Sequence, residues 1–235
     1  MLELDGLSRR FDGLKVIDGL DLTVAEGDVL GILGPNGAGK STLFNLIGGV
    51  LPVDAGRIHY RGRDITQMRA WDRCRIGIAR TYQIPKPFAH MSTFENVLVA
   101  AVHGGGLPIA RAKPEVEAVL ELTGLAHRSA LPAGRLSLLD LKRLELAKAL
   151  AQGPRLLLLD EIAGGLTEAE CDMLVAIVRA AHAKGTTVVW IEHVIQALRR
   201  IATRLAVLYA GAILADGRPD AVLADDRVKT VYLGI

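Results

Sequence analysis

The sequence predicts an α/β protein with a mainly parallel core sheet, an N-terminal antiparallel β layer and an α-helical lobe. Three observations support this class. The run Leu156–Leu159 is continuously apolar, as expected of a strand that is covered on both faces. Residues 1–27 alternate apolar and polar side chains in short runs, which is the period of half-buried strands. Residues 66–150 are mostly helical in pattern.

The N-terminal layer should contain short strands joined by turns. Leu20–Val24 alternates with a period of two, and the Asp-Gly and Glu-Gly pairs at 12–13 and 26–27 are turn signals. Gly56–Gly62 has the composition of a further strand in this layer. The apolar run Asp28–Leu33 then predicts a buried strand, and Leu43–Ile47 predicts the opening of a helix.

The later elements follow from the same patterns. Val116, Val119 and Leu120 share one face of a predicted helix, and breaks are expected at 103–108 and 131–134. A second helix should carry apolar residues at helical spacing between Met173 and Val178. The β-branched run Thr186–Ile191 predicts another buried strand, and residues 204–217 predict a hairpin that turns at Gly211.

Length and composition limit the class of protein. The 235 residues can bury a real core in one domain or two small lobes, and the hydrophobic fraction of 50% with few aromatic residues suits buried parallel strands. The net charge of +2 argues neither for nor against nucleic acid. The arginines between Arg57 and Arg80 are expected on a solvated face or in ion pairs between helices.

The sequence shows no sign of a membrane span or a leader. No stretch approaches the roughly 20 apolar residues that a span requires. Residues 1–5 have no basic region of the kind that opens a signal peptide. Cys74 and Cys171 fit no metal spacing and are expected as reduced thiols. We therefore expect the protein in the cytosol, unless a partner holds it at a membrane.

The segment Gly34–Thr42 fits the phosphate-binding pattern G-x-x-x-x-G-K-[ST] between a predicted strand and a predicted helix. Glycines let backbone N–H groups turn inward around phosphates, and the helix dipole adds partial positive charge. We expect Lys40 to reach the β- and γ-phosphates and the Ser41 hydroxyl to bind Mg²⁺. The predicted nucleotide-binding residues of this loop are Gly34, Asn36, Gly37, Ala38, Gly39, Lys40, Ser41 and Thr42.

Polar residues follow two of the predicted buried strands. Asp160 comes directly after four leucines, at the carboxyl end where ligands bind in parallel sheets, and could hold Mg²⁺ through water. Glu161 would lie one residue further out and polarise an attacking water. His193 follows the next strand and could hydrogen-bond a γ-phosphate oxygen. The simpler alternatives are a strand end capped by solvated acids and a surface histidine.

The phosphate loop, the LLLLDE strand end and the strand-end histidine, in that order, resemble the ATP-binding cassette of an ABC transporter, which is a P-loop NTPase. The resemblance covers nearly the whole chain and implies a single ATPase domain over residues 1–235 that uses ATP and Mg²⁺. It further implies a RecA-like core with the antiparallel layer in 1–83 and 154–235, and a helical lobe in 84–153.

The resemblance also implies site residues outside the phosphate loop. Gln83 matches the Q-loop glutamine, which contacts Mg²⁺ and the attacking water and whose loop senses the transmembrane subunits. Phe11 matches the aromatic residue that stacks on adenine, with Val16 beside it. Core packing is the alternative for Phe11, because stacking and burial leave the same trace in a sequence.

Within this superfamily the chain most resembles ATP-binding subunits of branched-chain amino acid importers. The resemblance implies an ATPase that powers uptake of branched-chain amino acids or a related polar solute from the inner face of the cell membrane. The implied partners are a second cassette, transmembrane permease subunits and, indirectly, a solute-binding protein, with no nucleic acid. The resembling segments are Asn36–Leu46, Arg80–Gln83, Glu95–Leu98, Leu144–Leu150, Glu192–Val194 and Val231–Gly234.

The chain departs from the family at its signature, LSGGQ, which aligns with Leu136–Asp140 (LSLLD). A side chain at the second glycine position, Leu139, crowds the approach of backbone N–H to a phosphate. Asp140 should stabilise the free helix but repel nucleotide. Ser137 and Asp140 also fit a helix N-cap pattern, so a helix start without a phosphate role is the alternative.

These departures suggest an unequal pair of cassettes. The chain keeps its own hydrolytic residues, but its signature should contribute poorly to the opposite site, which favours a heterodimer over a homodimer. A second departure is Thr167, where many cassettes have an aspartate. A threonine cannot accept hydrogen bonds as an aspartate does, so the sequence does not indicate how the two cassettes would be coupled.

Two other classes of protein explain the motifs less well. A cytosolic ABC-type ATPase that is not coupled to transport, acting on DNA or ribosomes, would usually carry long coiled-coil insertions or two cassettes, and a basic footprint. A GTPase switch protein would carry an Asn-Lys-x-Asp sequence, which this chain lacks, and would leave Glu161 and His193 unexplained.

Overall fold

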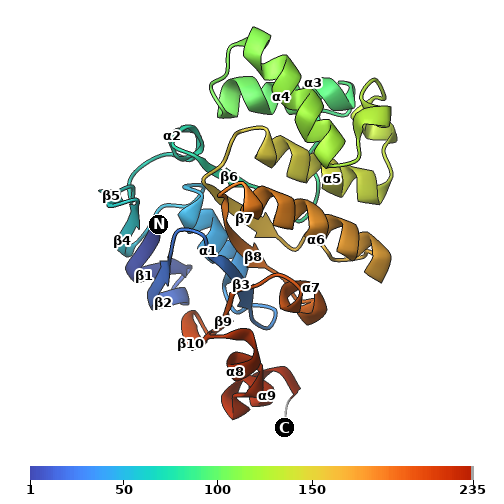
Figure 1. Ribbon diagram of the computed structural model, residues 1–235. Helices are drawn as coiled ribbons and strands as arrows, with labels where there is room; N and C mark the ends of the chain where they lie inside the picture. Colours follow the sequence, from blue (N-terminus) through green and yellow to red (C-terminus); the bar gives the residue numbers. More distant parts are fainter. Residues whose placement is uncertain (234–235) are drawn as a thin grey trace. The chain divides into compact units, whose positions relative to one another are not determined.

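The computed structural model describes residues 1–233 and shows an α/β protein (Figure 1). The chain divides into two compact units, one formed by Met1–Arg73 with the described part of Thr187–Ile235, and the other by Cys74–Thr186. The predicted class is confirmed, since the structure contains an antiparallel sheet, mainly parallel strands and helices. Gly234, which ends the last family-like segment, lies outside the described residues.

The first unit contains the predicted antiparallel layer, with strand order β2-β1-β4-β5. The turn between β1 and β2 is formed by Asp12 and Gly13, both with positive φ, as a two-residue hairpin turn requires. Arg61 and Gly62 form the equivalent turn, so the strand predicted to reach Gly62 ends at Tyr60. The strands are β1 (Leu2–Phe11), β2 (Leu14–Val24), β4 (Ala55–Tyr60) and β5 (Arg63–Asp64).

The first unit also contains the strand that leads into the phosphate loop. β3 (Val29–Leu33) lies between β8 (Thr187–Ile191) and β9 (Arg204–Tyr209), and is parallel to both. Every residue of β3 and β8 is buried, which explains their uninterrupted apolar sequences. β10 (Ala212–Gly217) returns antiparallel to β9 after the predicted turn at Gly211. The carboxyl ends of β3 and β8 therefore lie at the same edge of the sheet.

The helices associated with this unit vary in length. α1 continues directly from the phosphate loop, and α2 spans the boundary between the units. Of the C-terminal helices, α8 packs against β9 and β10, and α9 packs against β10. These helices are α1 (Lys40–Ile47), α2 (Ala70–Arg75), α7 (Ile195–Arg199), α8 (Pro219–Ala224) and α9 (Asp226–Leu233).

The second unit combines a short parallel strand pair with helices. β6 (Ile78–Arg80) pairs with β7 (Leu156–Asp160), and all of β7 is buried. The structure across 66–150 is mostly helical as expected, and β6, which was not predicted, interrupts it because three residues are too few to show a period. The helices are α3 (Thr93–Val99), η1 (Ala100–Gly104), α4 (Ile109–Leu122), η2 (Ala126–Arg128), η3 (Ala133–Arg135), α5 (Leu138–Leu150) and α6 (Glu168–Ala183).

The helices of the second unit pack on one another through α5. α3 contacts α4 and α5, and α5 contacts α6 (Figure 1, green to orange). Cys171 is buried and Cys74 half-buried, and the two thiols are not joined in a disulfide. Within residues 1–233, no helix has the length and apolar character needed to cross a bilayer.

Candidate functional site

The phosphate loop connects β3 to the first turn of α1. Gly39, the N-cap residue, has φ +103°, and no side chain caps this helix. The first turn also contains no acidic residue. Exposed N–H groups and the positive end of a helix dipole form an anion site, which is the chemistry predicted for this loop.

Two glycines let the loop lie directly on neighbouring backbone. A Cβ at Gly34 would lie 2.4 Å from the Leu208 carbonyl oxygen, and one at Gly39 would lie 2.7 Å from that of Val16. Gly211, in the β9–β10 turn, donates its N–H to the Ala38 carbonyl at 3.2 Å. The structure thus brings Val16 against the loop, beside Gly39, and its place beside the nucleotide stays a prediction.

Lys40 is buried and supports the loop from inside. Its Nζ donates to the carbonyl oxygens of Gly34 at 2.6 Å and Pro35 at 3.0 Å. Asn36, Gly37 and Ser41 are exposed, whereas Ala38 and Gly39 are buried and Thr42 is half-buried. The loop therefore presents an open outer surface, with an ammonium group held beneath it.

Phe11 is at the end of β1 and is not part of the core. Its side chain keeps 38% of its surface exposed, and the Arg9 guanidinium lies 4.9 Å from the ring centroid. A ring that is exposed at a hairpin end is available for stacking, whereas the alternative of core packing does not hold.

His193 follows β8 and is mostly exposed. Its Nδ1 lies 4.0 Å from a carboxylate oxygen of Glu192, which is fully buried. The other oxygen of Glu192 accepts a hydrogen bond from the Trp190 Nε1 at 3.2 Å. Sequence reasoning did not single out Glu192, although its spacing of two from Trp190 places both on one face of an extended segment.

In the second unit, Asp160 ends β7 and is 4% exposed. Arg80, at the end of the neighbouring β6, donates from Nη2 to the Asp160 Oδ2 at 2.7 Å. Such a charge-assisted bond between partly buried groups fixes the orientation of the carboxylate. The arginines between Arg57 and Arg80 were expected on a solvated face or in ion pairs between helices. Arg57, Arg61 and Arg63 are exposed as expected, whereas Arg73 is buried and Arg80 forms its ion pair between two strands.

Glu161 and Gln83, both predicted from the sequence, meet in the structure. The Gln83 Nε2 donates to the Glu161 Oε2 at 2.6 Å. Glu161 has φ +46°, and the other non-glycine residues with positive φ between 1 and 233 each precede a glycine in a turn. A strained backbone at a strand end is typical of functional positions, because the surrounding structure must hold it there.

The signature-like segment begins α5. Ser137 caps this helix by accepting the Asp140 N–H at 3.2 Å, so the N-cap interpretation is confirmed. The Asp140 carboxylate is nearly buried and lies 3.3 Å from Arg143 and 3.7 Å from Arg128. The negative charge expected to repel nucleotide is therefore compensated by two guanidinium groups of the same chain.

The segment after Glu161 is attached to the same helix. The Lys142 Nζ donates to the carbonyl oxygens of Ile162 and Gly164. Thr167 then caps α6 in a reciprocal capping box with Glu170. Its hydroxyl accepts the Glu170 N–H, so within its own chain Thr167 does accept a hydrogen bond.

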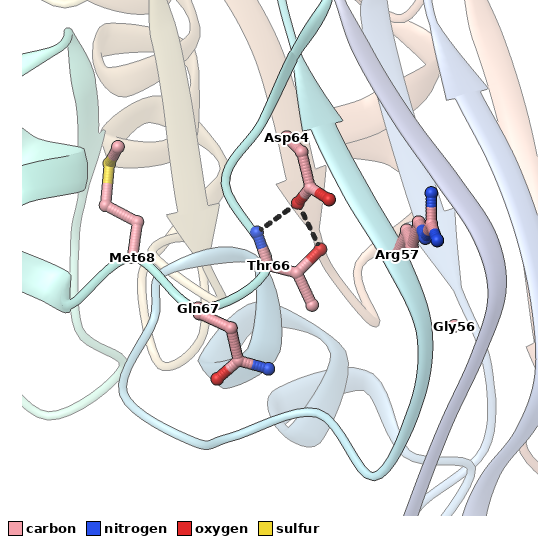
Figure 2. A pocket seen from close by; sticks show the side chains of 6 residues that line it. All are labelled: Gly56, Arg57, Asp64, Thr66, Gln67 and Met68. Atoms are coloured by element: carbon pink, nitrogen blue, oxygen red, sulfur yellow. Dashed lines mark hydrogen bonds between the residues drawn. The ribbon is translucent and has the colours of Figure 1, made fainter.

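A separate hollow of about 560 Å³ lies beside β4 and β5 in the first unit and is lined by none of the predicted site residues (Figure 2). Asp64, at its wall, accepts hydrogen bonds from the Thr66 hydroxyl at 2.6 Å and the Thr66 N–H at 2.8 Å. These bonds hold the pKa of Asp64 below its ordinary value. The Asp64 carboxylate is thus hydrogen-bonded within its own turn.

Comparison with known proteins connects this geometry to a family. The model of the ABC transporter family matches residues 17–164. Branched-chain amino acid transport ATP-binding proteins are similar throughout: LivG of Methanocaldococcus jannaschii, described as probable, is 33% identical over 100% of this chain and 97% of its own. BraF of Pseudomonas aeruginosa is 35% identical over 100% of this chain and 98% of its own. The lipopolysaccharide export system ATP-binding protein LptB of Acidithiobacillus ferridurans is 32% identical over 100% of this chain and 97% of its own.

Solved structures agree with these sequences. Two ATP-binding cassettes of ABC transporters, one nucleotide-free and one in an ADP conformation, each give a TM-score of 0.91 at 31% identity. Each comparison covers 100% of this chain and 99% of the solved one. The chain therefore belongs to the ABC transporter family, as an ATP-binding subunit with ATPase activity.

Proposed function

We propose that the chain powers an importer of branched-chain amino acids or a related polar solute. The observation that carries this proposal is the similarity to LivG and BraF over the whole of this chain and nearly the whole of theirs. The names of both proteins specify branched-chain amino acid transport. Export is the second candidate, because LptB aligns over the same extent at nearly the same identity.

In the first unit, Lys40 and the N-terminus of α1 would hold the nucleotide phosphates. Lys40 now donates to two loop carbonyls, and it would exchange these for β- and γ-phosphate oxygens. The glycines at 34 and 39 would let the loop turn its backbone N–H groups toward the phosphates. The exposed ring of Phe11 would stack on adenine, and Val16 would border it. His193 would hydrogen-bond a γ-phosphate oxygen.

In the second unit, Glu161 would act on the attacking water. A carboxylate can orient a water molecule and accept its proton as the bond to the γ-phosphorus forms. The hydrogen bond from Gln83 holds this carboxylate in place at 2.6 Å. Exchange of that bond for one to water would make Gln83 a partner of the same reaction.

The predicted Mg²⁺ ligands have suitable chemistry. Mg²⁺ prefers oxygen, which the Ser41 hydroxyl, the Asp160 carboxylate and the Gln83 amide supply. In the part of the chain that is described, no group of three or more His, Cys, Asp or Glu residues could hold a metal ion. Mg²⁺ needs none, because it usually takes one or two carboxylates together with substrate phosphates. When bound, it would neutralise charge that develops on those phosphates.

The altered signature supports a heterodimer with a different cassette. Leu138 and Leu139 replace the family's glycines, and their side chains block close backbone approach to a phosphate. We expect that this chain hydrolyses ATP faster beside a cassette with an intact signature than beside its own copy. Transmembrane permease subunits would hold the pair at the inner face of the membrane, and a solute-binding protein would deliver the solute.

Hydrolysis rates test the heterodimer directly. The rate of phosphate release is compared between the chain alone, the chain mixed with the partner cassette, and the double variant Leu139→Gly with Asp140→Gln alone. The double variant should approach the rate of the mixed pair. A chain that is fully active alone, and unchanged by these substitutions, would rule out the unequal pair.

Uptake measurements test the proposed solute class. In cells of the source organism that lack the gene, uptake of labelled leucine, isoleucine and valine should fall, and the wild-type gene should restore it. A Lys40→Ala gene should not restore it, because the loop loses its phosphate ligand. Normal uptake together with defective lipopolysaccharide transport would favour export instead.

A further inference from the structure

The segment from Ile84 to Phe88 follows Gln83 and alternates with proline (Ile-Pro-Lys-Pro-Phe). Proline keeps the preceding residue extended and has no N–H of its own. Lys86 and Phe88 therefore carry the only N–H groups between Pro85 and Phe88. The segment is not part of a helix or strand, so its backbone bonds must come from elsewhere.

Both polar groups of the Lys86 backbone are bound by one pair of side chains from α5. The Glu145 Oε1 accepts the Lys86 N–H at 2.8 Å, and the Lys148 Nζ donates to the Lys86 carbonyl at 2.9 Å. The two side chains are joined to each other at 2.6 Å. We call Glu145 and Lys148 the Lys86 clip.

A second side chain binds Phe88 in the same way. The Oδ1 of Asn96, on α3, accepts the Phe88 N–H at 2.8 Å, and its Nδ2 donates to the Phe88 carbonyl at 3.1 Å. Asn96 is fully buried. Side chains from two helices therefore hold a segment that could not hold itself.

One aromatic ring, that of Tyr82, lies near both Lys86 and Arg80. The Lys86 Nζ lies 5.1 Å from the centroid of Tyr82, and the Arg80 guanidinium lies 5.3 Å from the same ring. Both distances are within the range of cation–π attraction. Arg80 binds Asp160, and Gln83, next to Tyr82, binds Glu161. Contacts thus lead from Lys86 through the Tyr82 ring to Arg80 and Asp160, and Gln83, the partner of Glu161, precedes Lys86 in the same segment.

The burial of Glu145 needs an explanation. It is 3% exposed, and a buried ion pair is often no more stabilising than apolar residues of the same volume. An apolar pair could not, however, bind the N–H and the carbonyl of Lys86. The geometry points to a role in fixing this backbone, which only a paired acceptor and donor can perform.

We propose that Glu145 and Lys148 are positioning residues for ATP hydrolysis: by clipping Lys86 they set where Gln83 meets Glu161. This inference rests on the proposed roles of Gln83 and Glu161. Neither clip residue touches the reacting atoms. Loss of the clip should lower kcat, because small displacements of a catalytic group reduce rate strongly, and leave the KM for ATP nearly unchanged.

Two measurements on the purified full chain test the clip. Hydrogen exchange is followed at the Lys86 amide in Glu145→Ala, Glu145→Gln and Lys148→Gln, with Glu117→Gln on the exposed face of α4 as the control. We expect exchange at Lys86 to become about tenfold faster or more in Glu145→Ala. Glu145→Gln keeps an acceptor and should show a smaller effect. Lys148 is partly exposed, so its variant should fold even if Glu145→Ala does not.

Steady-state kinetics then connect the clip to the reaction. We expect kcat to be highest in the wild type, lower in Glu145→Gln and lowest in Glu145→Ala, with a total fall on the order of tenfold. The KM for ATP should stay within about twofold of the wild-type value. Unchanged exchange at Lys86 would overturn the clip, and faster exchange with unchanged kcat would overturn its positioning role. A failure of the proposed importer function would appear in the uptake measurements and would leave these comparisons unaffected.

Discussion

At the scale of single residues, Arg73 shows how a charged side chain can serve the fold. It is 1% exposed, and its guanidinium donates to the carbonyl oxygens of Leu46, Ile47, Ile65, Thr66 and Met68. Burial lowers its pKa to about 10, so it stays charged at neutral pH. Two of its acceptors lie in the last turn of α1, where carbonyls have no partner within the helix.

We therefore predict that Arg73→Met lowers the free energy of unfolding by roughly 2–4 kcal/mol, because several buried carbonyls lose their donor. Arg75→Met, on the same helix but exposed, is the matched control and should cost no more than about 0.5 kcal/mol. Urea unfolding of both variants measures the difference. Equal unfolding midpoints would contradict the structural role of Arg73.

The sequence predicts individual residues well where a motif fixes their environment. Gln83 and Glu161 were each expected to act at the attacking water, and the structure joins them by a hydrogen bond. The partners of Arg80 and Glu145 were not predicted, because they are 80 residues away at Asp160 and 59 residues away at Lys86. No local pattern encodes such a pair, so only the fold reveals it.

At the scale of elements, the helix N-termini differ in a way that matters for binding. α3 and α6 begin with reciprocal capping boxes, and α5 begins with Ser137 as its cap. α1 has no side-chain cap, and its N-cap is Gly39. α4, α7 and α8 also lack a side-chain cap, but α1 is the uncapped helix that begins at the phosphate motif, so no side chain takes its first N–H groups there.

Asp225, between α8 and α9, predicts a pH effect. Hydrogen bonds from the Arg227 side chain and backbone lower the pKa of Asp225 to about 2. Because this folded-state pKa lies below the unfolded value, the unfolded chain binds more protons between the two. The stability that Asp225 contributes is present above the unfolded pKa and is lost as pH falls toward 2.

Thermal unfolding at pH 5, 4 and 3 tests this effect. The midpoint should fall less between pH 5 and pH 3 in Asp225→Asn than in the wild type. Asp220→Asn, at an exposed position in α8, should keep the wild-type dependence. An identical pH dependence in all three proteins would show that the Arg227 contacts do not hold in solution.

Helices and strands were predictable where their hydrophobic pattern extends over many residues or where every residue is buried. β7 and β8 carry continuous apolar runs, and both were expected close to their observed bounds. β6 was missed because three residues cannot show a period, and η1 because a π-helical turn has no distinct sequence pattern. α1 begins at Lys40 rather than Leu43, since its first turn is part of the phosphate motif.

At the scale of the whole molecule, both units carry residues with predicted roles in one reaction. The first unit contains the phosphate loop and His193, and the second contains Asp160, Glu161 and Gln83. The family resemblance of the sequence extends along the whole chain and agrees with the solved cassettes at a TM-score of 0.91.

This chain is an ATPase, and we propose that Glu161 is the residue that acts on water. Phosphate release at saturating ATP and Mg²⁺ tests it most directly, in the wild type, in Glu161→Gln and in the control Glu117→Gln, with ATP binding measured for each. We predict that Glu161→Gln binds ATP like the wild type but loses about 10²–10⁴-fold in rate, the contribution of a general base. A Glu161→Gln protein that hydrolyses ATP at the wild-type rate would contradict the account.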